Sequence, residues 1–207
     1  MNKQELMQFE EEIKELFLEG KIRAPIHLSR GNEEQLIKIF KEIKKEDWCF
    51  STHRSHFHAL LKGISPGWLK QEILEGRSIG IHNKENRFFS SAIVGGICPI
   101  AVGVALAIKM KGEERHVYCF VGDMASYTGI FHESTTYAKN FNLPVTFAIE
   151  DNAYSTNTPT LLVWGITNFT WWEGKVRTLK RWENGGILYY RYTREFPHQG
   201  CGQWVQF

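Results

Sequence analysis

The sequence lacks the features that would tie it to nucleic acid or to an oxidising compartment. Its 25 basic and 23 acidic residues leave a formal net charge of only +2 at pH 7, which gives no electrostatic reason to expect a nucleic-acid partner. The four cysteines contain no Cys-x-x-Cys pair and lie among apolar or small residues. We therefore interpret them as reduced thiols without a disulfide or metal role.

Long apolar runs and targeting signals are also missing. No stretch reaches the roughly 18 apolar residues that a membrane span needs, and no basic segment followed by an apolar one opens the chain. Hydrophobic residues nonetheless make up 43% of the 207 residues, which is enough to bury a core and excludes a disordered chain. We expect a cytoplasmic protein that does not bind membranes and folds as a single domain over residues 1–207.

Four segments have helical patterns. Residues 3–19 carry an apolar stripe on an otherwise charged segment, and residues 33–45 place apolar side chains on one side and lysines on the other, so residues 1–50 form a region of N-terminal helices. A short helix is expected over residues 66–75. Residues 92–109 are rich in small apolar residues, which favours a buried helix packed closely against neighbouring backbone.

A strand–helix–strand pattern follows these helices. Residues 116–121 and 144–149 are short apolar runs that indicate buried strands, and residues 126–141 between them have a helical pattern. Such a βαβ unit implies parallel strands joined by a right-handed crossover. The sequence therefore predicts an α/β protein, with a three-layer α/β/α fold and a mainly parallel sheet, and a further strand-like run over residues 187–192.

Polar residues stand where both of these strands end. Asp123 follows the first strand, and Asn152 follows the second, 152 − 123 = 29 residues later. Ligands of parallel sheets bind at the carboxyl ends of the strands, and a carboxylate beside an amide oxygen suits Mg²⁺, whose remaining ligands are commonly phosphate oxygens and water. The start of the helix after Asp123 favours a diphosphate there. Alternatively, Asp123 only caps its helix and Asn152 only takes a turn conformation.

Five ordered segments, covering about residues 10–160, resemble a known family. "GDMAS…EDNAYS" is similar to its thiamine-diphosphate motif, Gly-Asp-Gly followed about thirty residues later by Asn-Asn. The others are "FLEGKIRAPIHLSRGNEE", "STHRSHFHALLKG", "AIVGGICPIAVGVALAIK" and "NLPVTFAIEDNAYSTNTPT". The family is the alpha subunits of the thiamine-diphosphate-dependent, decarboxylating component of 2-oxo acid dehydrogenase complexes. The resemblance implies a thiamine-diphosphate-binding domain.

The resemblance also implies a set of cofactor contacts. Asp123, the Asn152 side chain and the Tyr154 carbonyl would hold Mg²⁺, and Met124 and Ala125 would give backbone contacts to the diphosphate of the bound thiamine diphosphate.

Further contacts come from two other segments. Arg54 would bind the diphosphate through its forked donors, beside His53, which takes the place where the family usually has tyrosine. Ala92 and Val94 match backbone positions that meet the aminopyrimidine ring.

Three histidines match or approach catalytic positions of the family. His56 and His82 correspond to histidines at the active-site entrance, and for both the alternative is a solvated or core-satisfied side chain. "YYRYTREFPHQG" resembles the strand that leads to the family's histidine-bearing loop, which makes His198 the candidate loop histidine. The alternative for His198 is an exposed turn residue.

The sequence departs from the family pattern at several positions. Met124 replaces the second glycine of the motif, and Asp151 replaces the first asparagine. Residues 89–91, Phe-Ser-Ser, stand where glycines usually precede Ile-Val-Gly. The segment over residues 155–207 is shorter than the family's and holds five of the seven tryptophans, which we expect to pack against core or a partner surface.

These observations predict an enzyme subunit that acts on 2-oxo acids as part of an oxidoreductase. In the resembled family a separate beta subunit supplies the catalytic glutamate, so we expect an α2β2 assembly that passes an acyl group to a lipoyl acyltransferase and is inactive without the beta subunit. Two alternatives are the N-terminal half of a split transketolase-like enzyme and a non-catalytic scaffold that has lost the cofactor.

Overall fold

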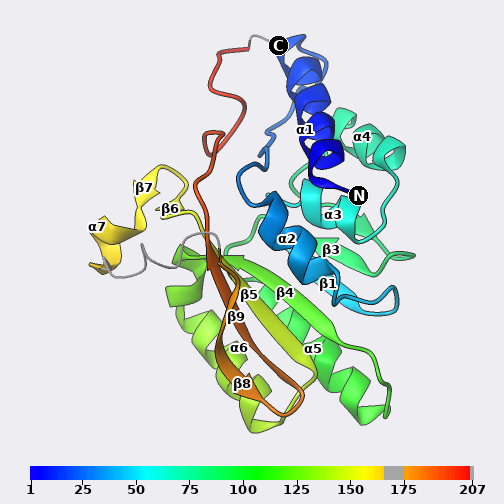
Figure 1. Ribbon diagram of the computed structural model, residues 1–207, viewed down its shortest axis with the longest axis vertical. Helices are drawn as coiled ribbons and strands as arrows, with labels where there is room; N and C mark the ends of the chain where they lie inside the picture. The colour runs from blue at the N-terminus through cyan, green and yellow to red at the C-terminus, as the bar shows by residue number, and fades with distance from the viewer. Residues whose placement is uncertain (166–174, 206–207) are drawn as a thin grey trace.

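A mixed seven-stranded sheet forms the centre of the computed structural model, which describes residues 1–165 and 175–205 (Figure 1). The five inner strands are parallel to one another, and the two outer strands, β2 and β8, are antiparallel to their neighbours. Across the sheet the strands are β2 (His82–Asn83), β3 (Phe88–Ser90), β1 (Trp48–Ser51), β4 (Val117–Gly122), β5 (Val145–Asp151), β9 (Gly185–Arg191) and β8 (Arg177–Trp182).

Helices cover both faces of the sheet (Figure 1). One face carries α1 (Lys3–Leu18), α2 (Glu33–Phe40), α3 (His56–Leu61) and α4 (Pro66–Leu74), and the other carries α5 (Ile97–Met110) and α6 (Gly129–Asn140). The small ladder of β6 (Tyr154–Ser155) and β7 (Thr158–Pro159) projects with α7 (Thr160–Trp164) to one side. This arrangement confirms the predicted three-layer α/β/α fold with a mainly parallel sheet. No helix within the described residues is long and apolar enough to cross a membrane.

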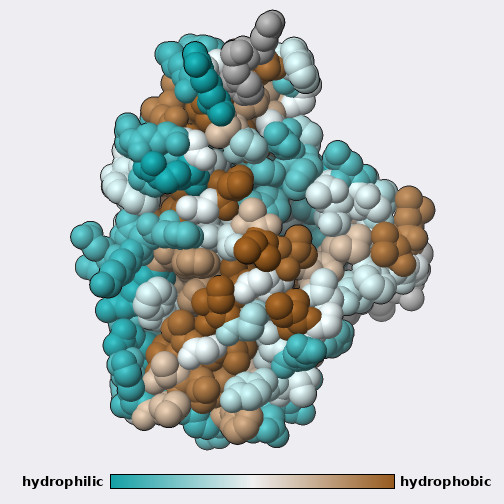
Figure 2. Space-filling model, turned by 180° about the vertical axis from the view of Figure 1, so that it is seen from behind, coloured by the Kyte–Doolittle hydropathy of each residue, from teal (hydrophilic) through white to brown (hydrophobic). Residues whose placement is uncertain are grey.

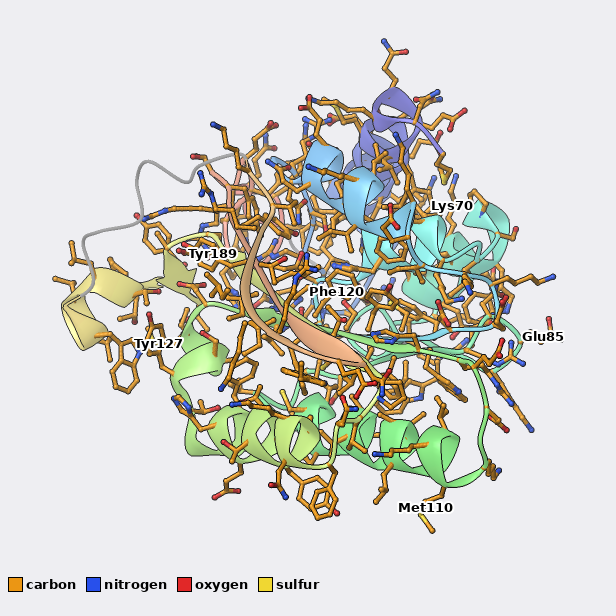
Figure 3. All side chains as sticks on the ribbon, turned by 60° about the horizontal axis from the view of Figure 1, so that its bottom comes forward. Lys70, Glu85, Met110, Phe120, Tyr127 and Tyr189 are labelled. Carbon is orange, nitrogen blue, oxygen red and sulfur yellow. The ribbon has the colours of Figure 1, made fainter. Side chains whose placement is uncertain are left out.

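Strand alternation explains how one sheet supports two cores. Successive side chains of a strand point to opposite faces, and on β4 Phe120 packs into the core under α1–α4, whereas Val121 packs against α5 and α6. Figure 3 shows Phe120 in the interior, between the layers. Tyr190 and Tyr189 on β9 divide in the same way. A sheet that is covered by helices on both sides needs apolar side chains on both of its faces, and these strands have them.

Three helices differ from their predicted bounds. The helix expected over residues 92–109 begins at Ile97, because Gly95 has a φ of 72° and a Cβ there would lie 2.5 Å from the Ile130 side chain. Residues 92–96 form a turn instead. The helix expected over residues 33–45 ends at Phe40, and the one expected over residues 126–141 is divided into a 3₁₀ turn, Met124–Tyr127, and α6.

The chain after β9 returns to the N-terminal half of the molecule (Figure 1). The Gly200 N–H donates to the Ile26 carbonyl at 2.9 Å, and His27 forms a bridge with Gly200. The predicted strand over residues 187–192 is therefore β9, and the predicted loop after it lies against the segment between α1 and α2. Among the tryptophans, Trp182 donates to the Leu143 carbonyl, while Trp204 is exposed. The Trp171–Trp172 pair lies outside the described residues.

The close contact between the residues before α2 and the segment after β9 should require a glycine at position 31. Its φ is +95°, and a Cβ would lie 2.1 Å from the Thr193 carbonyl oxygen. We expect Gly31→Ala to lower the free energy of unfolding by about 2–5 kcal/mol, because left-handed strain and backbone displacement add. Gly112→Ala is the matched control: its φ is +65°, but apart from its chain neighbours a Cβ there would have no atom of the described residues within 4 Å, so it should lose only about 1–2 kcal/mol. Equal losses in urea titrations would contradict this account.

Candidate functional site

A cavity lies at the carboxyl ends of β4 and β5. Six parts of the chain form its wall: Asn32 before α2, the segment after β1, the turn before α5, the end of β4 with its 3₁₀ turn, the end of β5 with the following residues through β6, and the segment after β9. All predicted cofactor-binding residues line it, namely His53, Arg54, Ala92, Val94, Asp123, Met124, Ala125, Asn152 and Tyr154. Positions far apart in sequence are thus brought to one place, although their roles stay predictions.

Asp123 is the most unusual polar group in this wall. Its side chain is buried, Oδ2 accepts a hydrogen bond from Thr160 Oγ1, and Oδ1 has no hydrogen-bond partner among the described residues. The pKa of Asp123 is raised to about 7, mainly by burial. The hydrogen bond from Thr160 lowers this pKa, and the nearby Asp151 carboxylate raises it. A buried carboxylate oxygen without a donor is the kind of atom that a bound cation satisfies.

Asn152 stands beside Asp123 in a tight turn. Its Oδ1 accepts from the Tyr154 N–H at 3.0 Å, its Nδ2 donates to Tyr192 Oη at 3.3 Å, and Ala153 between them has a φ of 65°. The turn interpretation of Asn152 therefore describes its local geometry. An amide oxygen has two lone pairs, so this single bond leaves one for a metal ion. The turn and the metal-ligand interpretations are compatible.

Asp151, the departure from the family's asparagine, is already engaged elsewhere. Its Oδ1 accepts from the Ala153 N–H at 2.8 Å, and its Oδ2 accepts from the Tyr189 hydroxyl. Arg191 Nε lies 4.0 Å from the same carboxylate. The additional charge is therefore used to fix the turn that carries Asn152, and it acts on Asp123 through space.

Arg54 lines the cavity and connects its own segment with two others. Its guanidinium is buried, with Nη1 donating to the Leu28 carbonyl and Nη2 donating to the His198 carbonyl at 3.1 Å. Within the described part of the chain these two bonds leave three donors, because guanidinium has five N–H groups. The Arg54 guanidinium is therefore a positive charge fixed in the cavity wall, which suits an anionic ligand.

The predicted catalytic histidines are not brought together. His198 lines the cavity, but His56 is fully buried between Glu10 Oε1, 3.1 Å from its Nδ1, and Ser78 Oγ, 2.9 Å from its Nε2. His82 is exposed, stacks on Phe89 and lies 3.1 Å from the Ser90 carbonyl. Neither lines the cavity, and their placements match the core-satisfied and solvated alternatives. The entrance role stays a prediction that this geometry does not support.

Arg194 and Glu150 line the cavity without having been predicted. The Arg194 guanidinium lies 4.4 Å from the centre of the Tyr154 ring and donates to the Thr156 carbonyl at 2.8 Å. Glu150 accepts bonds from Tyr190 and Asn32. Arg194 could have been predicted from the sequence, because it lies in the same segment after a predicted strand as His198. Glu150 shares a run with apolar strand residues, and its partners lie too far away in sequence to be inferred.

An apolar surface extends from the cavity along α5. Ile93 and Val94, in the turn before the helix, are 74% and 67% exposed, and Ile100 and Met110 continue the surface along it. Figure 2 shows hydrophobic side chains gathered on this face, and Figure 3 shows Met110 pointing outward at the end of α5. Contiguous exposed apolar residues beside a cavity are typical of an interaction surface.

Comparison with known proteins places the chain in a family. The model of the "Dehydrogenase E1 component" family matches residues 1–163. The alpha subunits of acetoin:2,6-dichlorophenolindophenol oxidoreductase from Bacillus subtilis and Cupriavidus necator are 33% and 34% identical over 75% and 72% of this chain, and 50% and 48% of their own length. The pyruvate dehydrogenase E1 component subunit alpha of Rickettsia prowazekii is 31% identical over 74% of this chain and 50% of its own. The chain spans about half the length of these relatives.

The raised pKa of Asp123 predicts an unusual stability change. Between its ordinary value of 3.8 and about 7 the folded protein holds a proton that the unfolded chain releases, so this group's stabilisation is complete at low pH and is lost as pH rises through 7. Without divalent cations, Asp123→Asn should therefore melt above the parent at pH 8, and this difference in melting temperature should be smaller at pH 5.

Asp47→Asn is the matched control for this measurement. Asp47 is equally buried, but its two carboxylate oxygens accept from the Lys44 and His116 N–H groups, both at 2.8 Å. Replacing one oxygen with an amide nitrogen breaks a bond, so this variant should melt below the parent at pH 8. A lower melting temperature for Asp123→Asn at pH 8 would contradict the interpretation of Asp123.

Proposed function

Because this chain belongs to the dehydrogenase E1 component family, we propose that it is the alpha-type subunit of a thiamine-diphosphate-dependent 2-oxo acid dehydrogenase. In this proposal residues 1–207 form one thiamine-diphosphate-binding domain, which holds the Mg²⁺-diphosphate half of the cofactor. The observation that carries it is the gathering of all predicted cofactor-binding residues in one cavity wall, with the unpartnered Asp123 Oδ1 among them.

The donor chemistry of the wall fits Mg²⁺. Asp123 offers a buried carboxylate oxygen and Asn152 an amide oxygen with a free lone pair. The carbonyl of Tyr154 is the third ligand. A dication would also stabilise the ionised form of Asp123, which burial now disfavours.

Arg54 and the turn after β4 would hold the diphosphate. The guanidinium supplies fixed charge and donors, and the backbone N–H groups of Met124 and Ala125 supply further donors. The Met124 side chain contacts Trp164, with Sδ 2.6 Å from the indole Nε1. Its thioether therefore has a place in the structure, which is how a side chain is accommodated where the family has glycine.

Bound thiamine diphosphate supplies a nucleophilic thiazolium carbon and an electron sink for cleavage of the 2-oxo acid. The residues of this chain contribute position rather than chemistry. Arg54 and the metal ligands anchor one end of the cofactor, and the backbone at Ala92 and Val94 orients the aminopyrimidine. His198 is held at the cavity wall through its own carbonyl by Arg54, within reach of a substrate there.

A partner subunit completes the proposed site. The resemblance assigns the glutamate that activates the cofactor to a beta subunit, and the apolar surface from Ile93 to Met110 begins in the cavity wall. A beta subunit covering this surface would bury exposed apolar residues and close the cavity in the same step. We propose an α2β2 assembly in the cytoplasm that transfers its acyl group to a lipoyl acyltransferase. The names of the relatives favour this over a transketolase-like half.

Cofactor binding can be measured calorimetrically on the chain with its beta partner. Thiamine diphosphate should bind only when Mg²⁺ is present, and Asp123→Ala should weaken binding at least about 10–100-fold, the range lost with residues that only orient a ligand. His132→Ala, an exposed residue of α6, is the control and should bind like the parent. Absence of metal-dependent binding would instead favour a scaffold that has lost the cofactor.

Catalysis should require both subunits. The purified chain alone should not decarboxylate pyruvate, branched-chain 2-oxo acids or ketose phosphates, because the resemblance assigns the activating glutamate to a beta subunit. Coexpression with a beta-type chain encoded nearby should give decarboxylation of one 2-oxo acid, measured with an artificial electron acceptor. Full turnover by the single chain, or turnover of ketose phosphates alone, would contradict the proposed function.

A further inference from the structure

Three histidines from distant parts of the chain meet at one side of the cavity. His27 precedes α2, His53 follows β1, and His198 follows β9. One ring nitrogen from each lies within 4.8 Å of those of the other two. The ring centres are 4.4 Å apart for His27 and His53, and 4.8 Å apart for His27 and His198, with the rings edge to face rather than stacked.

The backbone holds these histidines together. The Gly200 N–H donates to the Ile26 carbonyl, which places the segments of His198 and His27 side by side. Arg54, the neighbour of His53, donates to the Leu28 carbonyl and to the His198 carbonyl. Each histidine therefore belongs to a segment that is tied to both of the others. This is a built cluster rather than a chance meeting of surface side chains.

The histidine rings are in the form that binds metals. Burial lowers the pKa of His27 to about 2 and that of His53 to about 4, and it also lowers the pKa of His198. All three imidazoles are therefore neutral at pH 7, so a metal ion would not have to displace a proton. His27 is only 7% exposed, and its Nδ1 has no hydrogen-bond partner within the described part of the chain. That unpartnered nitrogen is a second sign of a missing ligand.

We propose that His27, His53 and His198 form a transition-metal site of the Zn²⁺ type, separate from the hard-cation site at Asp123. Neutral imidazoles suit Zn²⁺, whereas Mg²⁺ prefers oxygen. Zn–N distances of about 2.0–2.1 Å put tetrahedral ligand nitrogens roughly 3.3 Å apart, so small side-chain rotations close the cluster. His53 and His198 line the cavity, so the fourth position is open to it.

Two features define the expected strength and origin of the site. The Arg54 guanidinium beside the cluster opposes a second positive charge, so binding should be weaker than at a closed structural zinc site. His53 occupies the position where the resembled family usually has tyrosine. A tyrosine would leave two histidines, so the site is a property of this chain's own substitution.

The test is equilibrium dialysis of the full chain against Zn²⁺, with excess Mg²⁺ present to occupy the oxygen site. The parent should bind one Zn²⁺ per chain, and Co²⁺ in its place should give the visible absorption of a four-coordinate nitrogen site. His53→Tyr should lower Zn²⁺ affinity at least about 100-fold, since even residues that only orient a ligand are worth roughly 10–100-fold. His132→Tyr, the same change on the exposed face of α6, should leave it unchanged.

A second ligand variant allows the zinc site to be tested even if His53→Tyr does not fold. If His53→Tyr does not fold, His198→Gln removes a half-buried ligand in a loop and should give the same loss. Unchanged affinity in a folded ligand variant, an equal loss in His132→Tyr, or no stoichiometric binding by the parent would each overturn the proposal. Asp123→Ala should retain Zn²⁺ binding while losing metal-dependent thiamine diphosphate binding, which separates failure of this site from failure of the proposed function.

Discussion

The parallel pairing of β4 with β5 is the constraint on which the site depends. The two strands run in register from Val117 opposite Val145 to Gly122 opposite Glu150, so both end at the same edge of the sheet. Asp123 and Asn152 follow these ends and must therefore lie close together. The helix between the strands allows them to run parallel, because a parallel pair needs a crossover connection. Apolar strand residues thus position polar groups that they do not contact.

Local periodicity was sufficient to predict this part of the fold. Two apolar runs with a helical segment between them have few other solutions in an α/β protein. The errors occurred where a single backbone conformation decides the outcome. Gly95 has a positive φ and lies against Ile130, so the helix begins only after it, and residues 92–95 form part of the cavity wall instead. The four-residue β1 strand and the shorter β2 and β3 carry too few residues for a periodic signal.

The sequence predicted several of the residues that line the candidate site, but not the hydrogen bonds and charges around them. The ordered motifs identified part of the cavity wall, because the residues that they name lie near strand or helix ends that the fold brings to one edge. His56 shows the limit of this reasoning. Its environment is set by Glu10, 46 residues away, and by Ser78, and no local pattern reveals either contact. The same holds for His27, whose neighbourhood is created by the returning segment after β9.

The polar groups at this edge are maintained against the ordinary tendency of a folded protein to satisfy them. Asp123 keeps one buried oxygen without a donor, and its pKa near 7 reflects the cost of charge there. His27 keeps an unpartnered nitrogen in the same way. Each unpartnered atom lowers the stability of the folded chain by about 1–3 kcal/mol. Nearby hydrogen bonds offset this cost, because the turn at Asn152 and the bonds of Arg54 hold the cavity wall in place. Under the proposed function a bound ligand would satisfy these atoms, so binding would raise the stability of the folded chain.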